Sequence, residues 1–107
     1  MANIIPFAFR GELFSGTHNF ASGGDAFKIA LYTANPYTTS STTVTATSEV
    51  SSAGSSNYTR KALGSQAVAS STAVASVDFA DSTWSSATFT AAFAAIYNDD
   101  KSDKLCV

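Results

Sequence analysis

The residues of this chain that could take part in acid–base or nucleophilic chemistry are few. His18 is the only histidine and Cys106 the only cysteine, so a Ser-His-Asp or Cys-His mechanism would depend on them. No serine lies in a G-x-S-x-G motif. Cys106 stands in an apolar run without an activating neighbour, which favours a buried, inert thiol, and a structural histidine near a helix end accounts for His18. The sequence therefore predicts that the protein is not an enzyme.

Metal and phosphate sites have weak support in the sequence. The stretch NDDKSD supplies Asp99, Asp100 and Asp103, whose carboxylates suit a hard cation such as Ca²⁺. It lacks the central glycine and the distal glutamate of an EF-hand loop, so a solvated turn is the simpler interpretation. The Gly-Gly pair at 23–24 is an ordinary turn signal, and one cysteine builds neither a disulfide nor a cysteine-based zinc site. We expect no cofactor and no metal.

Trp84 is the only tryptophan and has two interpretations. It is either an exposed anchor at an interface, or a platform for stacking a sugar, or it caps the core by packing over Phe79 and Phe89. Aromatic side chains of this kind usually belong to the core, which favours the cap. We keep Trp84 among the candidate contact residues.

Composition limits the kinds of partner. Only 13% of the 107 residues are charged and the net charge is −2, so there is no electrostatic reason to expect nucleic acid or an acidic membrane as a partner. The apolar N-terminus has no basic residue before it and does not resemble a secretory signal. No apolar run is long enough to span a bilayer. We expect residues 1–107 to form a single β domain that is made and folded in the cytoplasm.

The spacing of apolar residues predicts several short elements. Residues 7–18 carry Phe9, Leu13 and Phe14 at helical spacing, which predicts a short helix weakened by two glycines. Residues 26–33 alternate as a half-buried strand. Two further alternating runs, joined at Ser70-Ser71, predict a hairpin.

Residues 35–57 form a Ser/Thr-rich loop. Only Val44 and Val50 are large enough to contribute to a core. A loop of this length inside a compact domain is unusual, so it is either a projecting functional loop or contains a short edge strand near 42–47.

The stretch 81–99 fits two kinds of secondary structure. Phe89, Phe93 and Ile96 lie on one stripe of a helix, whereas Phe89, Phe93 and Tyr97 lie on one face of a strand. The neighbouring β-type runs and the threonines beside Phe89 favour the strand. The fold class that follows is mainly β, an antiparallel β-sandwich with one short N-terminal helix.

Three segments carry a resemblance to a known family. HNF…GDAFKIALYT, SEVSSAGSSNYTRKAL and VDFADSTWSSATFTAAFAAIYND are similar to segments of small structural proteins encoded by tailed bacteriophages, especially marine and cyanobacterial ones. Glu49-Val50 and Tyr58-Thr59 match the middle segment of that family, while 51–57 and 60–61 depart from it by losing glycines. These motifs contain no catalytic residues. The resemblance implies a strand over 87–97, with Trp84 at its entry.

Both ends of the chain suggest contacts with other subunits. KLCV stops without a turn, whereas the family pattern implies a glycine turn and a further strand. Either the sequence is a truncated portion or something else completes the sheet edge. Residues 1–8 form an apolar, Pro-containing arm of the kind that docks by strand addition. The residues expected at subunit contacts are Ile4, Ile5, Phe7, Trp84, Leu105 and Val107.

The expected function is structural. The resemblance implies a virion protein in many copies, a capsid decoration or cement protein or another head, neck or tail component. The alternative is a host-recognition, glycan-binding β-module of a tail fibre. Other virion proteins are the expected partners in a homo-oligomer, located in the virion and assembled in the host cytoplasm.

Overall fold

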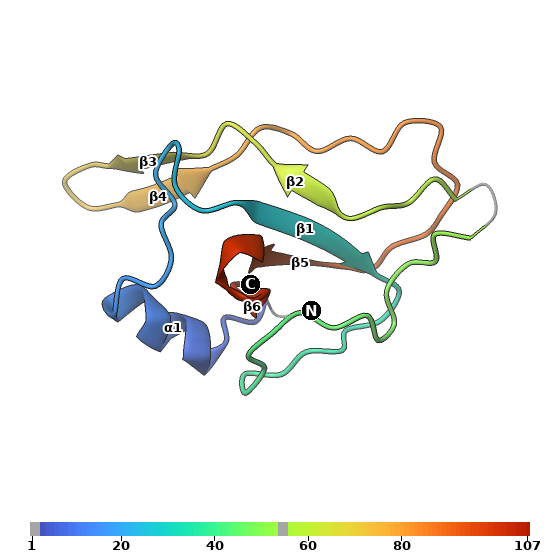
Figure 1. The fold of residues 1–107 in the computed structure, drawn as a ribbon, viewed down its shortest axis with the longest axis horizontal. Coiled ribbons are helices and arrows are strands. Elements are labelled where there is room, and N and C mark those ends of the chain that lie inside the picture. The colour runs from blue at the N-terminus through green and yellow to red at the C-terminus, as the bar shows by residue number, and fades with distance from the viewer. Residues whose placement is uncertain (1–2, 54–55) are drawn as a thin grey trace.

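A four-stranded antiparallel sheet forms the centre of the protein in the computed structural model, which describes residues 3–53 and 56–107 (Figure 1). Its strands are β1 (Phe27–Tyr32), β2 (Lys61–Leu63), β5 (Phe93–Asn98) and β6 (Lys104–Leu105), in the order β2-β1-β5-β6. The longest pairing joins β1 to β5 along the full length of both strands. Two segments about 65 residues apart in the sequence, β1 and β5, therefore lie side by side in one sheet.

A hairpin and a helix complete the fold. Strands β3 (Ala67–Ser70) and β4 (Ala75–Asp78) form a separate antiparallel pair, in which every residue is exposed. Helix α1 (Phe7–Phe14) precedes β1, and a single 3-10 turn, η1 (Asp99–Lys101), connects β5 to β6. The predicted mainly β, antiparallel fold with one short N-terminal helix is confirmed. Because the second sheet is a hairpin without buried residues, the core lies on the larger sheet.

The main cluster of buried apolar side chains lies on one face of the four-stranded sheet. Ala30 and Tyr32 of β1, Ala95 and Tyr97 of β5, and Leu105 of β6 are buried together there. They share a face because side chains alternate along a strand.

The Ser/Thr-rich loop covers this core. Val44 and Tyr37 pack against it and Val50 is buried. The Tyr32 hydroxyl donates a hydrogen bond to the Thr45 carbonyl, 2.8 Å away. The expected projecting loop is therefore wrong for these residues, because the loop lies against the sheet.

The same loop pairs with the edge of β6. Thr43 forms an isolated β-bridge with Lys104. The Val44 N–H donates to the Asp103 carbonyl and the Leu105 N–H donates to the Thr42 carbonyl, each at 3.0 Å. Of the edge strand expected near 42–47, the structure forms only this isolated bridge. Residues 54–55 of the predicted loop and 1–2 of the predicted arm lie outside the described residues.

The stretch that fitted both helix and strand forms a strand at its end. Strand β5 begins at Phe93, six residues later than the strand over 87–97 implied by the resemblance. The Ala92 N–H donates to the carbonyl of Tyr32, the last residue of β1. Because β1 ends there, it offers no partner to the residues before Ala92. The strand interpretation is confirmed and the helical one is wrong.

The hairpin forms where alternation predicted it, with different bounds. Its turn spans Ser71–Val74, closed by a hydrogen bond from the Ser71 N–H to the Val74 carbonyl at 2.7 Å. The first alternating run does not continue from β2 into β3, because Ser65 adopts a positive φ of 52° that ends the extended backbone.

Candidate assembly surface

An apolar groove lies between α1, the base of the hairpin and the sheet face opposite the core. Its volume is about 360 Å³. Helix α1 and the hairpin lie toward the same end of the sheet (Figure 1). The lining includes Phe9, Leu13, Phe20, Val77, Phe79 and Ile96. None of these side chains is charged, so the groove is suited to another apolar group.

Helix α1 also presents exposed apolar side chains, of which Leu13 lines the groove whereas Phe7 and Phe14 do not. None of its residues is buried. Phe14 is 95% exposed, Phe7 59% and Leu13 48%. Several large apolar side chains exposed on one helix, together with an apolar groove along that helix, indicate an interaction site. We refer to the groove together with Phe7, Leu13 and Phe14 as the helix–groove surface.

Two residues of α1 attach the helix to the rest of the protein. A carboxylate oxygen of Glu12, Oε2, lies 2.7 Å from Lys104 Nζ on β6, and Oε1 lies 3.7 Å from Nε2 of His18. The Phe9 ring lies 5.1 Å from the His18 ring and packs edge-on against Phe20. The helix is thus held by its Phe9 and Glu12 side, which leaves the opposite side outward.

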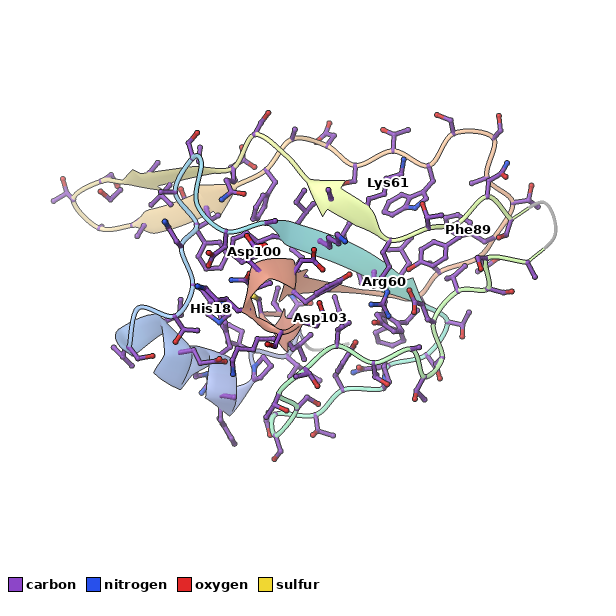
Figure 2. All side chains as sticks on the ribbon, viewed as in Figure 1. His18, Arg60, Lys61, Phe89, Asp100 and Asp103 are labelled. Carbon is purple, nitrogen blue, oxygen red and sulfur yellow. The ribbon has the colours of Figure 1, made fainter. Side chains whose placement is uncertain are left out.

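A buried hydrogen-bond network supports this attachment (Figure 2). The Asn98 amide nitrogen donates to Nδ1 of His18 at 2.9 Å and to Oδ2 of Asp25 at 2.8 Å. Its oxygen accepts from the Asp100 N–H at 3.1 Å. An amide nitrogen can only donate, so Nδ1 of His18 is the acceptor and a neutral ring carries its hydrogen on Nε2, toward Glu12. His18 therefore has a structural place in the fold.

Asp25 remains ionised within this network. Burial by itself would raise the pKa of Asp25, but hydrogen bonds from the Asn19 N–H and the Asn98 amide outweigh it. The nearby charge of Lys101 acts in the same direction as these hydrogen bonds, so the net pKa is lowered. The carboxylate thus stays an acceptor at neutral pH.

The three aspartates considered for a cation site do not converge on one position, because two of them contact different groups and the third is exposed. Asp99 pairs with Lys28 at 3.2 Å, and Asp100 accepts a hydrogen bond from the Ala26 N–H at 2.9 Å. Asp103 is exposed. Among the described residues, no group of three or more His, Cys, Asp or Glu side chains is placed to hold a metal ion. Through Asp99 and Asp100, η1 instead contacts the start of β1.

A second cavity of about 220 Å³ brings both ends of the chain together. Its lining includes Ile4 of the arm, Phe93 of β5, Leu105 and Val107. Val107 lines the groove as well, so this residue borders both cavities. Of the residues expected at subunit contacts, Ile4, Leu105 and Val107 thus meet at one place.

The other expected contact residues divide between surface and core. Ile5, just before α1, and Phe7, its first residue, are both exposed. Leu105 is only 2% exposed, because the loop at 42–44 and the core side chains cover it. Its side chain belongs to the core and offers no surface to another subunit.

Trp84 lies apart from the helix–groove surface. Its indole N–H donates to the Thr59 carbonyl at 2.7 Å, and its ring stacks near Tyr58. It meets Phe89 edge-on, as the cap interpretation expected, and Lys61 Nζ lies 6.0 Å from the ring centre. The expected contact with Phe79 is replaced, because that ring packs near Phe27.

Arg60 and Glu49 form an ion pair that was not anticipated from the sequence. Arg60 makes two hydrogen bonds of 2.8 Å to the Glu49 carboxylate, which also accepts one from the Tyr58 hydroxyl at 2.7 Å. The Arg60 hydrogen bonds lower the pKa of Glu49, although burial opposes them. Arg60 also lies over the Tyr97 ring, near the end of the sheet away from His18 (Figure 2). No spacing signal in the sequence marks such a pair, since eleven positions separate its members.

No helix among residues 3–53 and 56–107 is long and apolar enough to cross a membrane. The chain matches no protein-family model, no curated protein and no solved structure. The function of the helix–groove surface is therefore inferred from its residues and geometry.

Proposed function

We propose that this chain is a structural protein of a tailed-bacteriophage particle, present in many copies and held there through the helix–groove surface. The observation that carries the proposal is the position of Phe14, 95% exposed on a helix that borders an uncharged apolar groove. Apolar surface of this kind favours burial against a partner, because each Å² of apolar area removed from water contributes about 25 cal/mol. A capsid or tail subunit would supply that partner.

The sequence resemblance supports the same role. The segments that resemble phage structural proteins contain β1 and β5, the two central strands, which pair along their full length. The resemblance therefore involves the framework of the fold.

The residues needed for a nucleophilic mechanism are engaged elsewhere, which also favours a structural role. The His18 side chain is buried and hydrogen-bonded to Asn98. Cys106 is buried, and burial together with the charge of Glu12 raises the pKa of its thiol to about 12. A thiol with this pKa is almost entirely protonated at neutral pH and is a poor nucleophile.

The glycan-binding alternative depends on Trp84, and its contacts give that alternative little support. Tyr58, Phe89 and Lys61 surround the ring, and its N–H already donates to the Thr59 carbonyl. A sugar-stacking platform needs a free ring face. The structural role is therefore the preferred proposal.

Quantitative mass spectrometry of purified particles tests this role. Particles of the phage that encodes the chain are expected to contain it in many copies, in fixed ratio to the major capsid or tail protein. A handful of copies per particle would favour the fibre alternative. Absence of the chain from purified, infectious particles would overturn the proposal.

A further inference from the structure

We propose that residues 80–88, in the segment between the hairpin and β5, form a strap that covers the open edge of β2 and prevents β2 of a second copy from pairing with it. The strap is an autoinhibitory contact built into the fold. When its side-chain contacts are removed, two copies pair edge to edge through β2. This inference concerns a different surface from the helix–groove surface and does not depend on the proposed function.

The outer edge of β2 presents backbone groups that no other strand occupies, because β2 is the first strand in the order β2-β1-β5-β6. On the β5 side of β1, the Tyr32 carbonyl accepts a hydrogen bond from the Ala92 N–H. Backbone groups alternate between the two sides of a strand, so those of Lys28 also point toward β5. Lys28 lies opposite Ala62 in the pairing of β1 with β2. The N–H and C=O of Ala62 therefore point outward, at an exposed position.

The strap runs antiparallel to the segment that contains β2 and bonds to it at both ends (Figure 1). The Ala80 N–H donates to the Gly64 carbonyl at 2.9 Å, and the Thr88 N–H donates to the Ser56 carbonyl at 3.0 Å. In the described part of the chain, no backbone hydrogen bond joins residues 81–87 to β2. The strap thus lies beside β2 without forming a fifth strand, and the outward groups of Ala62 stay without a backbone partner.

Two side-chain hydrogen bonds hold the middle of the strap. The Trp84 indole N–H donates to the Thr59 carbonyl at 2.7 Å, and the Asn57 amide nitrogen donates to the Ser86 carbonyl at 2.7 Å. Lys61 of β2 places its Nζ 6.0 Å from the centre of the Trp84 ring. Trp84 is therefore the strap residue whose side chain reaches β2.

The opposite edge of the same sheet is also covered by the chain itself. There the loop at 42–44 bonds to β6 through the bridge between Thr43 and Lys104. Open strand edges pair readily with other chains, and natural proteins cover them with loops or place charges such as lysine on them. The covering of β6 uses backbone bonds, whereas that of β2 also depends on side chains. The β2 edge is therefore the one that substitutions can open.

A second copy of the chain fits the opened edge. A two-fold axis at Ala62 pairs β2 with β2 in the antiparallel direction, so that the Ala62 N–H of each copy meets the Ala62 C=O of the other. This register places Lys61 opposite Leu63 and Arg60 opposite Gly64. No two charges of like sign then face each other directly, so the pairing has no direct electrostatic penalty.

Sedimentation equilibrium of the full chain tests the strap. Asn57→Gly combined with Trp84→Phe removes both side-chain donors. Glycine tolerates the positive φ of 53° at position 57, and phenylalanine keeps an aromatic ring at position 84. This double variant is expected to self-associate about tenfold more tightly than wild type. Trp84→Phe alone, the milder change, is expected to give a smaller part of the same increase, and circular dichroism checks that each variant is folded.

Two substitutions of Ala62 show whether this association uses β2. Ala62→Asp places like charges opposite each other at the two-fold axis, and Ala62→Pro removes the outward N–H without breaking the pairing with β1. Each is expected to return the double variant to the wild-type association and to leave the association of the wild-type chain unchanged. Ala69→Asp, at an exposed position of β3, is the matched control and is not expected to weaken the association.

Two results would overturn the strap. One is a folded double variant that associates no more tightly than wild type. The other is an increased association that Ala62→Asp and Ala62→Pro reduce no more than Ala69→Asp does. Either result leaves the proposed function standing, because the number of copies in purified particles tests that function separately.

Discussion

The Asn98 amide donates a hydrogen bond to Nδ1 of His18 at 2.9 Å, across 80 positions of sequence. The contact joins the end of β5 to the segment that follows α1. His18 in turn faces Glu12 of α1. The position of the helix, and therefore the shape of the groove, depends on this buried pair.

Replacing Asn98 by alanine is expected to lower the free energy of unfolding by about 2 to 4 kcal/mol. The substitution removes two hydrogen bonds and leaves the buried Nδ1 of His18 without its donor. Urea denaturation followed by the fluorescence of Trp84 measures the change. Asn3→Ala, at an exposed position, is the matched control. Equal unfolding midpoints for the two variants would contradict the structural role of Asn98.

Alternation of side chains was enough to predict the local elements. The alternating run at 26–33 predicted β1 to within one residue at each end. For the stretch at 81–99, the neighbouring β-type runs favoured a strand, and its end forms β5. The spacing of apolar residues also predicted helix α1. It did not predict that no residue of the helix would be buried. That exposure depends on which elements pack nearby, and local periodicity does not report it.

The polar contacts could not be predicted, because they join residues far apart in sequence. Asn98 meets Asp25 across 73 positions, and nothing near either residue indicates the other. Leu105 was expected at a subunit contact because the last strand had an open edge. The chain's own residues at 42–44 cover that edge instead.

The pair of Glu49 and Arg60 is expected to make stability depend on pH. The pKa of Glu49 is lower in the folded protein than in the unfolded chain, so this contribution is present above the unfolded value of about 4.3 and is lost as pH falls through the folded pKa. Asp25 acts in the same direction. Glu49→Gln should be less stable than wild type by about 1 to 3 kcal/mol at neutral pH.

Urea denaturation of wild type and Glu49→Gln at a series of pH values checks this. The difference between the two proteins should shrink below about pH 4, where the wild-type carboxylate becomes protonated. A difference that stays constant down to pH 3 would show that the charge of Glu49 contributes nothing.

Cys106 is expected to react slowly with thiol reagents in the folded protein. Burial, and secondarily the charge of Glu12, raises the pKa of its thiol to about 12, so little thiolate exists at pH 8. The rate with a disulfide reagent should rise on the order of a hundredfold when the chain is unfolded in urea. Equal rates in the folded and unfolded states would contradict the buried position of the thiol.

Hydrogen exchange should separate the two sheets. The amides of β1 and β5 are expected to exchange slowly, because these strands are paired along their full length and lie beneath the core. The amides between β3 and β4 should exchange fast, because every residue of this two-stranded hairpin is exposed. Hairpin amides as protected as those of β1 in the dilute protein would contradict this.

Competition for places in the particle tests the central claim most directly. Wild-type chain and Phe14→Asp would be supplied together during infection, and quantitative mass spectrometry would compare their ratio in the lysate with their ratio in purified particles. Because Phe14 is exposed, the variant should fold, yet we expect it to be strongly depleted from particles. Incorporation of both chains in the ratio present in the lysate would contradict assembly through the helix–groove surface.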